Sequence, residues 1–495
     1  MASQISLRRT GIIVFTARIA SIFTGLAFLV MMTRSLSAEQ FGLWEVVIDI
    51  VTFAAYPAGL VAFWATRDIA RGKMFGKTAV LINFLLSLLG IGLYFVFSLV
   101  SAPRISADIS TLTLAVLLVP ISYWNQAANA VVSGHKPSVL GFAVIVSEVA
   151  KLAVAFPLLI IYKTGIEGVI LSVIVANLAQ SAASTLLAGD ALSNPVEIGA
   201  ARRWLSNSWL PVLTTLPLMF GIADTYVASL AAAGTSLVGY YQAAYSVAAI
   251  AGYSYYLASA MYPLLLRGGD HSVTARTLEF ALLVGIPMAT GGAALAKPIL
   301  YFLNPVYADG SLALSILCFA VLVNTVSMVF DQTLSGRDKV DVDESSRFRD
   351  FLGSNLLFVA KVNLAVGVTY VAAVYAVVAV GLSSGLSVPA VLELWATAQL
   401  LIIGGFVLVK LKRIGLIGQP TFARSELYYA AGALVMGVSL WLLGGLIQYK
   451  VGSLRFALEL GAVSLTGLGI YGAFVLAVDD KLRALARRVV RETFF

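Results

Sequence analysis

The sequence has little charge for its length and almost no cysteine or histidine. Of its 495 residues, only 12% are charged, whereas 60% are hydrophobic and the mean hydropathy is +0.92. A soluble domain of this size needs far more charge to cover its surface, so the composition excludes a large soluble protein. Cys318 is the only cysteine, which excludes an internal disulfide and a thiolate metal cage.

Further absences exclude classes of enzyme and metalloprotein. The chain has no Gly-rich strand–loop–helix motif that could cradle phosphates, so we expect no ATP hydrolysis. Its two histidines, His135 and His271, are far apart and lack metal-ligand spacing. We therefore expect no catalytic residue, no metal site and no cofactor, with a coupling proton or sodium ion as the only small ion that the sequence leaves open.

Long apolar runs dominate what is present. Each membrane-spanning helix uses about 20 apolar residues, and the runs lack the alternation of a membrane β-barrel. The sequence therefore predicts an all-α polytopic membrane protein of about 14 transmembrane helices. The predicted spans are 11–33, 41–65, 78–101, 110–133, 139–162, 165–188, 208–231, 237–265, 277–296, 311–335, 353–379, 388–409, 427–448 and 456–477.

The distribution of basic residues predicts the orientation of these spans. With the N-terminus inside, twenty-four of the 33 Lys and Arg residues fall in cytoplasmic segments, six in outer segments and three within spans. Cytoplasmic loops carry an excess of Lys and Arg, so both termini are predicted to be cytoplasmic. The net charge of +8 then reflects topology, and no nucleic-acid partner is expected.

Two short repeats suggest an internal duplication. FGLW at 41–44 resembles VGYY at 238–241, and VSGHK at 132–136 resembles LSGR at 334–337. Both pairs are separated by six spans, an even number, so the two halves share one orientation and form parallel lobes. The predicted organisation is a six-helix lobe at 1–190, a second at 191–410, two additional helices at 411–477 and a basic cytoplasmic tail at 478–495.

Several connections resemble those of a known family. TRSLSAEQFGLW at 33–44 looks like the span 1–2 connection of polysaccharide flippases. Asp224, followed by Gly234, Gly239 and Tyr240, is similar to their span 7–8 connection, and LSGRDK at 334–339 to the segment after span 10. These O-antigen and exopolysaccharide flippases belong to the multidrug/oligosaccharidyl-lipid/polysaccharide exporter superfamily, together with multidrug and toxin extrusion carriers and lipid II flippases.

The resemblance implies an inverted-V carrier in the plasma membrane that moves a polyprenyl-phosphate- or pyrophosphate-linked glycan outward. It also implies contacts with membrane lipids and glycan-assembly enzymes, and action as a monomer. In lipid II flippases, cavity arginines on span 1 meet the pyrophosphate, and Arg18 stands where one of them would. The second such arginine is missing, because Arg34 at the outer end of the span is the only other basic residue there.

Charged residues within spans are costly, so each must face a partner or water. Arg18 either faces the cavity and binds phosphate oxygens or pairs with Glu45 or Asp49 of span 2. Glu45 and Asp49 lie four residues apart on one helical face, which suggests a coupling-ion site centred on Asp49, unless Glu45 is simply hydrated at the outer surface.

Three further positions are candidates for transport chemistry. Glu148 is a coupling-ion candidate, although Lys151 three residues later can neutralise it on the same helix. Asp224 and Lys361 have no obvious local partner and are expected to face the lumen between the lobes, Asp224 as a coupling-ion candidate and Lys361 as a phosphate ligand.

Uncharged polar side chains give span 4 a sugar-binding character. Asn125 and Gln126 lie too deep for an interfacial belt, so they contact either cargo or neighbouring helices. Tyrosines in 240–256 fit either sugar stacking or an aromatic belt. The tail from Asp480 to Phe495 is predicted to form a short helix on anionic headgroups.

Two other functions remain open on the sequence. A cation-coupled multidrug exporter of the same superfamily fits the charged spans, but such carriers usually have twelve spans. A membrane-embedded glycosyltransferase or polymerase generally needs a large outer loop or a catalytic acidic motif, and every predicted outer loop is short. The sequence therefore favours a non-enzymatic carrier of a lipid-linked glycan.

Overall fold

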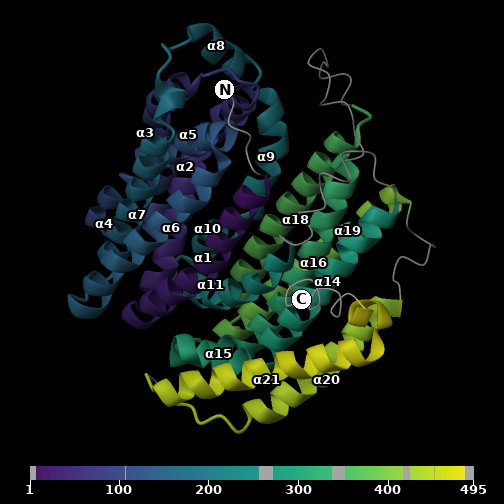
Figure 1. Cartoon of the computed structure of the whole chain (residues 1–495). Helices are drawn as coiled ribbons and strands as arrows, with labels where there is room; N and C mark the ends of the chain where they lie inside the picture. The colour runs from purple at the N-terminus through teal and green to yellow at the C-terminus, as the bar shows by residue number, and fades with distance from the viewer. Residues whose placement is uncertain are drawn as a thin grey trace. The chain divides into compact units, whose positions relative to one another are not determined.

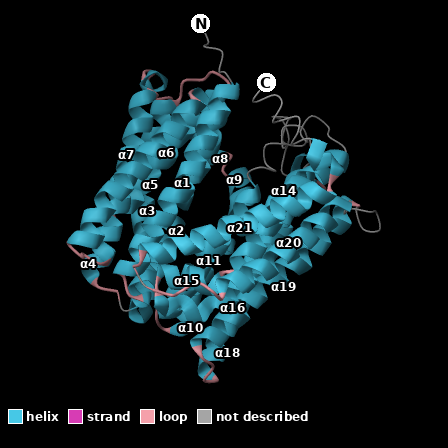
Figure 2. Cartoon of the chain, turned by 60° about the horizontal axis from the view of Figure 1, so that its bottom comes forward, coloured by secondary structure: helices cyan, strands magenta, loops and turns pink. Residues whose placement is uncertain are grey.

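The computed structural model describes residues 7–105, 107–255, 271–336, 352–415, 424–450 and 452–484. Within these ranges every regular element is a helix (Figure 2). Eleven of the helices are long and apolar enough to cross a membrane. The prediction of an all-α, multi-pass membrane protein is therefore confirmed.

The chain divides into two compact units, residues 1–239 and 240–495 (Figure 1). The helices of unit 1 are α1 (Leu7–Ser35), α2 (Ala38–Ala70), α3 (Gly76–Ile105), α4 (Ile109–Ala115), α5 (Leu118–His135), α6 (Pro137–Ala155), η1 (Phe156–Ile161), α7 (Ile166–Leu187), η2 (Gly189–Leu192), α8 (Ile198–Ser206), α9 (Trp209–Gly221), α10 (Asp224–Ala232) and the start of α11 (Ser236–Ala248).

Unit 2 contains the rest of α11 and the elements that follow it. These are η3 (Ala249–Tyr253), α14 (His271–Ala294), α15 (Ala296–Leu303), η4 (Pro305–Gly310), α16 (Ser311–Gly336), α18 (Asn355–Ser383), α19 (Val388–Ile414), α20 (Arg424–Gly444) and α21 (Leu454–Val478).

Eleven of the fourteen predicted spans coincide with candidate membrane helices. Of the other three, the span at 11–33 lies in α1, the span at 110–133 is divided between α4 and α5, and the span at 237–265 is described only as far as residue 255. The predicted tail helix lies outside the described residues from 485 onward. The apolar runs thus located the spans, but not the breaks within them.

Unit 1 extends beyond the predicted first lobe. Trp204 of α8 is 1% exposed and donates its indole N–H to Asp68 of α2 at 2.9 Å. Its ring packs against Phe75, in the connection between α2 and α3. The predicted lobe boundary between residues 190 and 191 therefore falls inside this compact unit, because α8 is held by contacts made with α2 and its flanking segment.

The two additional C-terminal helices pack within unit 2. Tyr429 and Met436 of α20 are buried in one apolar cluster with Phe456 and Val475 of α21. The hydroxyl of Tyr471 in α21 donates to the carbonyl of Leu283 in α14 at 2.8 Å. This hydrogen bond and the cluster attach both helices to α14.

The repeated glycines found in the sequence allow a close backbone approach. A Cβ added to Gly42 in α2 would lie on the carbonyl oxygen of Thr235 and 2.7 Å from the amide nitrogen of Gly239. A Cβ on Gly239 would in turn lie 2.9 Å from the carbonyl carbon of Ala38. The hydroxyl of Thr235 donates to the carbonyl of Glu39 at 2.8 Å. Both repeat positions therefore require glycine because two backbones meet there.

Candidate functional site

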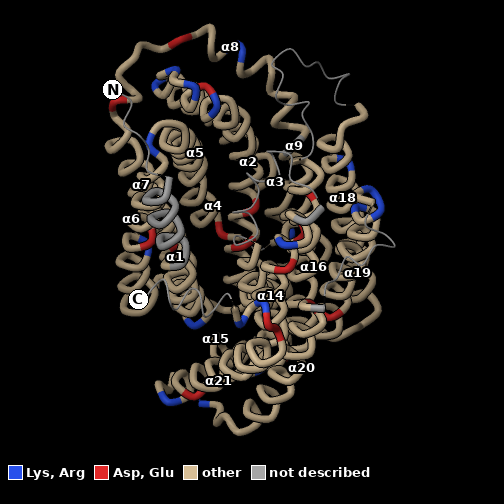
Figure 3. The backbone as a smooth tube through the Cα atoms, turned by 45° about the vertical axis from the view of Figure 1, so that its right-hand side comes forward, with Lys and Arg blue, Asp and Glu red and all other residues tan. Residues whose placement is uncertain are grey.

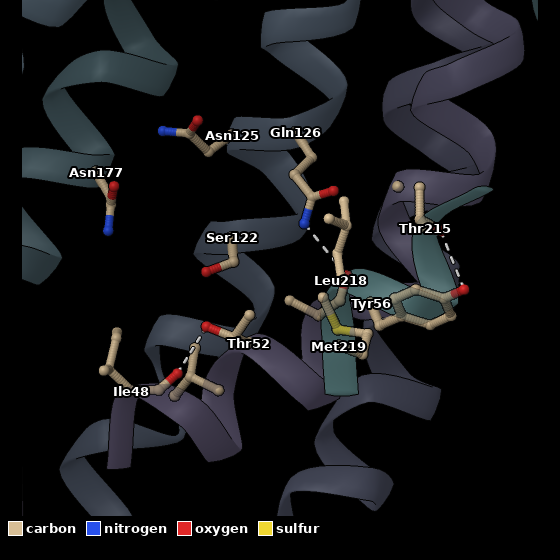
Figure 4. Close-up of a pocket in the computed structure, with 13 residues that line it drawn as sticks. Ile48, Thr52, Tyr56, Ser122, Asn125, Gln126, Asn177, Thr215, Leu218 and Met219 are labelled. Atoms are coloured by element: carbon tan, nitrogen blue, oxygen red, sulfur yellow. Dashed lines mark hydrogen bonds between the residues drawn. The ribbon is translucent and has the colours of Figure 1, made fainter. Parts of the chain in front are cut away.

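Unit 1 contains a polar pocket of about 370 Å³ between α2, α5, α7 and α9 (Figure 4). All thirteen residues that line it are uncharged. Seven of them carry hydroxyl or amide groups: Thr52, Tyr56, Ser122, Asn125, Gln126, Asn177 and Thr215. The pocket can therefore donate and accept hydrogen bonds without attracting an ion of either sign.

The two amides predicted from span 4 both line this pocket. Gln126 donates to the carbonyl of Ala55 at 3.2 Å, and the side-chain oxygen of Asn125 accepts from Asn129 at 2.5 Å. The Asn125 amide nitrogen is buried and has no hydrogen-bond partner among the described residues. In Figure 4 this side chain extends from α5 toward the helix that carries Asn177. A buried donor without a partner costs about 1–3 kcal/mol, so a ligand oxygen would be favoured there.

A tyrosine and a threonine form the opposite side of the pocket. The hydroxyl oxygen of Thr215 in α9 lies 2.6 Å from the carbonyl oxygen of Pro211 and 3.1 Å from the Tyr56 hydroxyl, within hydrogen-bond distance of both. The Tyr56 ring comes from α2, and its contact with Thr215 links the two helices. The sequence analysis missed both residues because isolated hydroxyls in apolar spans usually bond to their own backbone.

A break in the predicted span 208–231 positions a group of acids. The span forms two helices, α9 and α10, and α10 begins at Asp224. The carboxylate of Asp49 in α2 accepts from the hydroxyl of Thr225 and from the backbone amide of Tyr226, both in the first turn of α10. Asp49 thus satisfies one free N–H group at the N-terminus of α10, where the helix dipole favours an anion.

Two more carboxyl groups lie within electrostatic range of Asp49. One is Glu45, a turn earlier in α2, and the other is Asp224, which is 9% exposed. Among the residues whose side chains the structure describes, which do not include Arg18, no basic side chain forms an ion pair with Glu45 or Asp49. Asp49 also stands between Ile48 and Thr52, both of which line the pocket. The acid cluster therefore lies beside the polar pocket on the same helix.

Glu148 lies in α6 and forms an ion pair with Lys151. Lys151 donates to its carboxylate at 2.9 Å, and Thr24 of α1 donates to the same group at 2.6 Å. The Lys151 ammonium also lies 5.2 Å from the centre of the Phe28 ring. Glu148 is thus neutralised on its own helix and joins α6 to α1, which matches the structural alternative for this residue.

Unit 2 contains a buried polar cluster around Lys410, which could not be predicted from the sequence. Lys410 was counted among the cytoplasmic residues, but its side chain is 1% exposed and lies between α16, α18 and α19. It donates to Ser327 at 2.7 Å, to Asn363 at 2.8 Å and to the Asp331 carboxylate at 2.7–2.9 Å. A lysine at the end of an apolar run looks identical in sequence whether it points to solvent or inward.

The two predicted phosphate ligands belong to different units. Lys361 is exposed on α18 in unit 2. Arg18 belongs to α1, but it lies outside the residues whose side chains the structure describes. Of the predicted residues, the structure therefore brings Asn125 and Gln126 together at the pocket, and Asp49 and Asp224 together beside it.

Comparison with solved structures shows which fold this is. The lipid II flippase MurJ, in an inward closed conformation, matches with a TM-score of 0.67 and 14% identity, over 96% of this chain and 99% of that one. An inward-facing multidrug resistance MATE family transporter of the MOP superfamily matches with a TM-score of 0.56 and 14% identity, over 80% of this chain and 95% of that one.

The sequence itself matches no protein-family model and no curated protein. At 14% identity the two structural likenesses establish the fold alone, a polytopic helical fold that this chain shares with both proteins.

Proposed function

We propose that this chain is a membrane carrier that flips a polyprenyl-phosphate- or pyrophosphate-linked oligosaccharide from the cytoplasmic to the outer leaflet. The movement would be alternating access of two lobes. It would take place in the plasma membrane with both termini in the cytoplasm, and it would involve no chemical change of the cargo. Glycan-assembly enzymes would supply the cargo, and a single chain would suffice.

The observation that carries this proposal is the uncharged, amide-lined pocket of unit 1. Sugar hydroxyls need a high density of neutral donors and acceptors, which Asn125, Gln126 and Asn177 provide. The Tyr56 ring adds an apolar face on which a sugar ring can stack. Arg18 and Lys361 are the proposed contacts for the phosphate groups of the cargo, because cationic side chains bind phosphate oxygens strongly.

The acid cluster beside the pocket is the proposed coupling site. Three carboxylates close together inside a membrane repel one another, so the group favours uptake of a proton or a sodium ion. Asp49 and Asp224 are the proposed ligands. Glu148 is a weaker candidate because Lys151 already supplies its positive charge.

A second candidate function is cation-coupled export of drugs. The likeness to the multidrug transporter and the acid cluster both favour it. That likeness covers 80% of the chain, however, against 96% for the flippase. We therefore rank drug export second, with a membrane-embedded glycosyltransferase third.

Reconstitution into liposomes tests the proposal. A labelled polyprenyl-diphosphate-linked oligosaccharide, added to proteoliposomes, should become protected from an external glycosidase in a protein-dependent manner. Asn125→Ala should slow this protection, whereas Asn194→Ala, in an exposed connecting segment, should not. Absence of any protein-dependent protection, together with efflux of a lipophilic cationic dye, would assign the chain to drug export.

A further inference from the structure

A second cavity of unit 1 differs sharply from the polar pocket. It is an apolar groove of about 540 Å³ between α3 and α5, which we call the α3–α5 groove. It is lined by Val80, Leu81 and Phe84 of α3 and by Ile121 and Trp124 of α5, with Lys77 as its only charged residue. Leu81 and Phe84 are 40% and 65% exposed on a membrane-spanning helix. The groove therefore opens toward the hydrocarbon of the bilayer.

Lys77 lies at one end of this groove. It is the second residue of α3, at the end of the helix that the distribution of basic residues assigns to the cytoplasm. Phe84, seven residues later, lies about 10 Å deeper along the helix axis. The groove thus runs from a cationic head at the inner membrane surface into the apolar interior.

The Lys77 ammonium is available for a ligand. Within the described residues it forms no hydrogen bond and no ion pair. The acidic residue Glu197, in the segment before α8, is a possible partner because it contacts Thr78, the residue next to Lys77. Its backbone amide donates to the Thr78 hydroxyl at 2.9 Å, but its carboxylate does not pair with Lys77. The nearby Lys73 and Arg203 are instead engaged by Asp68, at 3.0 and 3.1 Å.

The surrounding surface is positive and amphipathic. The segments 66–77, 135–137 and 188–207 contain seven Lys and Arg residues and three Asp and Glu residues. Figure 3 shows several Lys and Arg segments at the end of unit 1 near α8. Ile198 and Leu205 of α8 are 78% and 45% exposed beside Arg202 and Arg203. Such a helix suits the interface of a membrane that contains anionic lipids.

We propose that the α3–α5 groove binds an anionic glycerophospholipid of the cytoplasmic leaflet. One acyl chain lies against Leu81, Phe84 and Ile121, and the lipid phosphate pairs with Lys77. A zwitterionic lipid presents the same chain and phosphate but adds a positive charge next to the lysine, so the site discriminates by net headgroup charge. This lipid site is separate from the polar pocket and does not depend on the proposed transport function.

Lipid titration of the delipidated, full-length protein tests the proposal, with phosphatidylglycerol and phosphatidylcholine as probes and native mass spectrometry as the readout. Phosphatidylglycerol should bind more tightly. Lys77→Gln should weaken its binding about fivefold, the effect of one lysine at a membrane surface, and leave phosphatidylcholine unchanged. Lys412→Gln removes an exposed charge at the end of α19 and should change neither.

A second experiment fills the α3–α5 groove with a larger side chain. Ile121→Trp should reduce the binding of both lipids. If this variant does not fold, Leu81→Trp, at a more exposed position, replaces it in the same experiment. Unchanged phosphatidylglycerol binding in Lys77→Gln and in the tryptophan variant would overturn the proposal. Displacement of phosphatidylglycerol by a lower concentration of polyprenyl phosphate would also overturn it, because the groove would then belong to the cargo chain.

Discussion

Asp49 in unit 1 and Asp331 in unit 2 are both carboxylates inside membrane helices, but they are balanced in different ways. Asp331 accepts from the Lys410 ammonium at 2.7–2.9 Å and from Asn363 at 3.0 Å. Asp49 instead accepts from the Thr225 hydroxyl and the Tyr226 amide, and it has two further carboxyls nearby. One acid is neutralised by a full charge of the protein itself, whereas the other, among the side chains that the structure describes, meets the partial charge of a helix N-terminus.

This difference separates a structural ion pair from a candidate coupling site. All three N–H groups of the Lys410 ammonium have oxygen acceptors, so the unit 2 cluster is complete and has no need of an external ion. Among the side chains that the structure describes, Asp49 of unit 1 has the acids Glu45 and Asp224 nearby and no paired base. An exchangeable proton or cation would therefore act in unit 1, while the pair in unit 2 holds three helices together.

The largest expected effect is on the stability of unit 2. Lys410→Ala would leave Asp331 charged and unpaired, so the free energy of unfolding should fall by about 3–5 kcal/mol. Denaturation in detergent measures this, with Lys412→Ala, an exposed neighbour, as the matched control. The double variant Lys410→Met with Asp331→Leu should recover most of the loss. Wild-type stability of Lys410→Ala would remove the distinction between the two clusters.

The next effect should appear in transport. Asp49→Asn keeps the acceptor for Thr225 but removes the charge, so the protein should fold while its transport rate falls about tenfold and loses its dependence on pH or sodium. Asp331→Asn provides the contrast, because it should lower stability by leaving Lys410 unpaired. Proteoliposome assays across pH and sodium concentration distinguish the two. Retention of wild-type ion dependence by Asp49→Asn would rule out its coupling role.

A smaller effect should follow from removing one hydroxyl in each unit. Thr225→Val deletes the donor to Asp49 and should reduce the free energy of unfolding by about 1 kcal/mol. Among the residues that the structure describes, Thr325 in α16 donates to the carbonyl of Val321 in its own helix alone, at 3.1 Å. Thr325→Val should therefore have a much smaller effect. Equal losses in the two variants would mean that the Asp49 contact adds nothing beyond ordinary packing.

The smallest effect concerns Asp190, an exposed carboxylate outside the spans that contacts two basic residues. Hydrogen bonds from His135 and Lys136, both at 2.9 Å, hold the pKa of Asp190 well below its usual range. This carboxylate therefore adds stability above its unfolded pKa of about 3.9, and the contribution is lost as the pH falls through the lower folded value. Asp190→Asn should lower the thermal midpoint slightly at pH 7, and the difference should shrink progressively as the pH falls below about 3.9, with Glu197→Gln as a neutral control. A difference that stays constant as the pH falls would contradict the ion-pair explanation.

Much of the fold could be predicted because hydropathy acts locally along the chain. Eleven predicted spans coincide with candidate membrane helices, and both glycines of the predicted repeat, Gly42 and Gly239, lie near the start of a helix. The break before Asp224 was missed because a single apolar run continues across it. Trp204 was missed as an anchor of unit 1 because its partner, Asp68, lies 136 residues away in the sequence.

Only part of the candidate site could be predicted, again because sequence patterns are local and the site combines residues from different helices. Asn125 and Gln126 stood out as two adjacent amides deep in an apolar run, whereas Thr215, from another helix, gave no such signal. Tyr241, which fits an aromatic belt by its position, is instead 1% exposed and stacks on Trp395 with ring centres 3.8 Å apart. Sequence position gives the depth of a residue in the membrane but not the direction of its side chain.

By itself, the sequence determined the class of protein, the approximate number of spans and the residues too polar to face lipid, because the cost of burying charge in a bilayer acts on each segment separately. Only the tertiary structure decided which of those residues meet. It paired Lys410 with Asp331 and brought Thr24 to Glu148, and it placed the acids around Asp49 beside an uncharged pocket. Those outcomes depend on the rotation of each helix about its axis, which is set by packing against neighbours that lie far away along the chain.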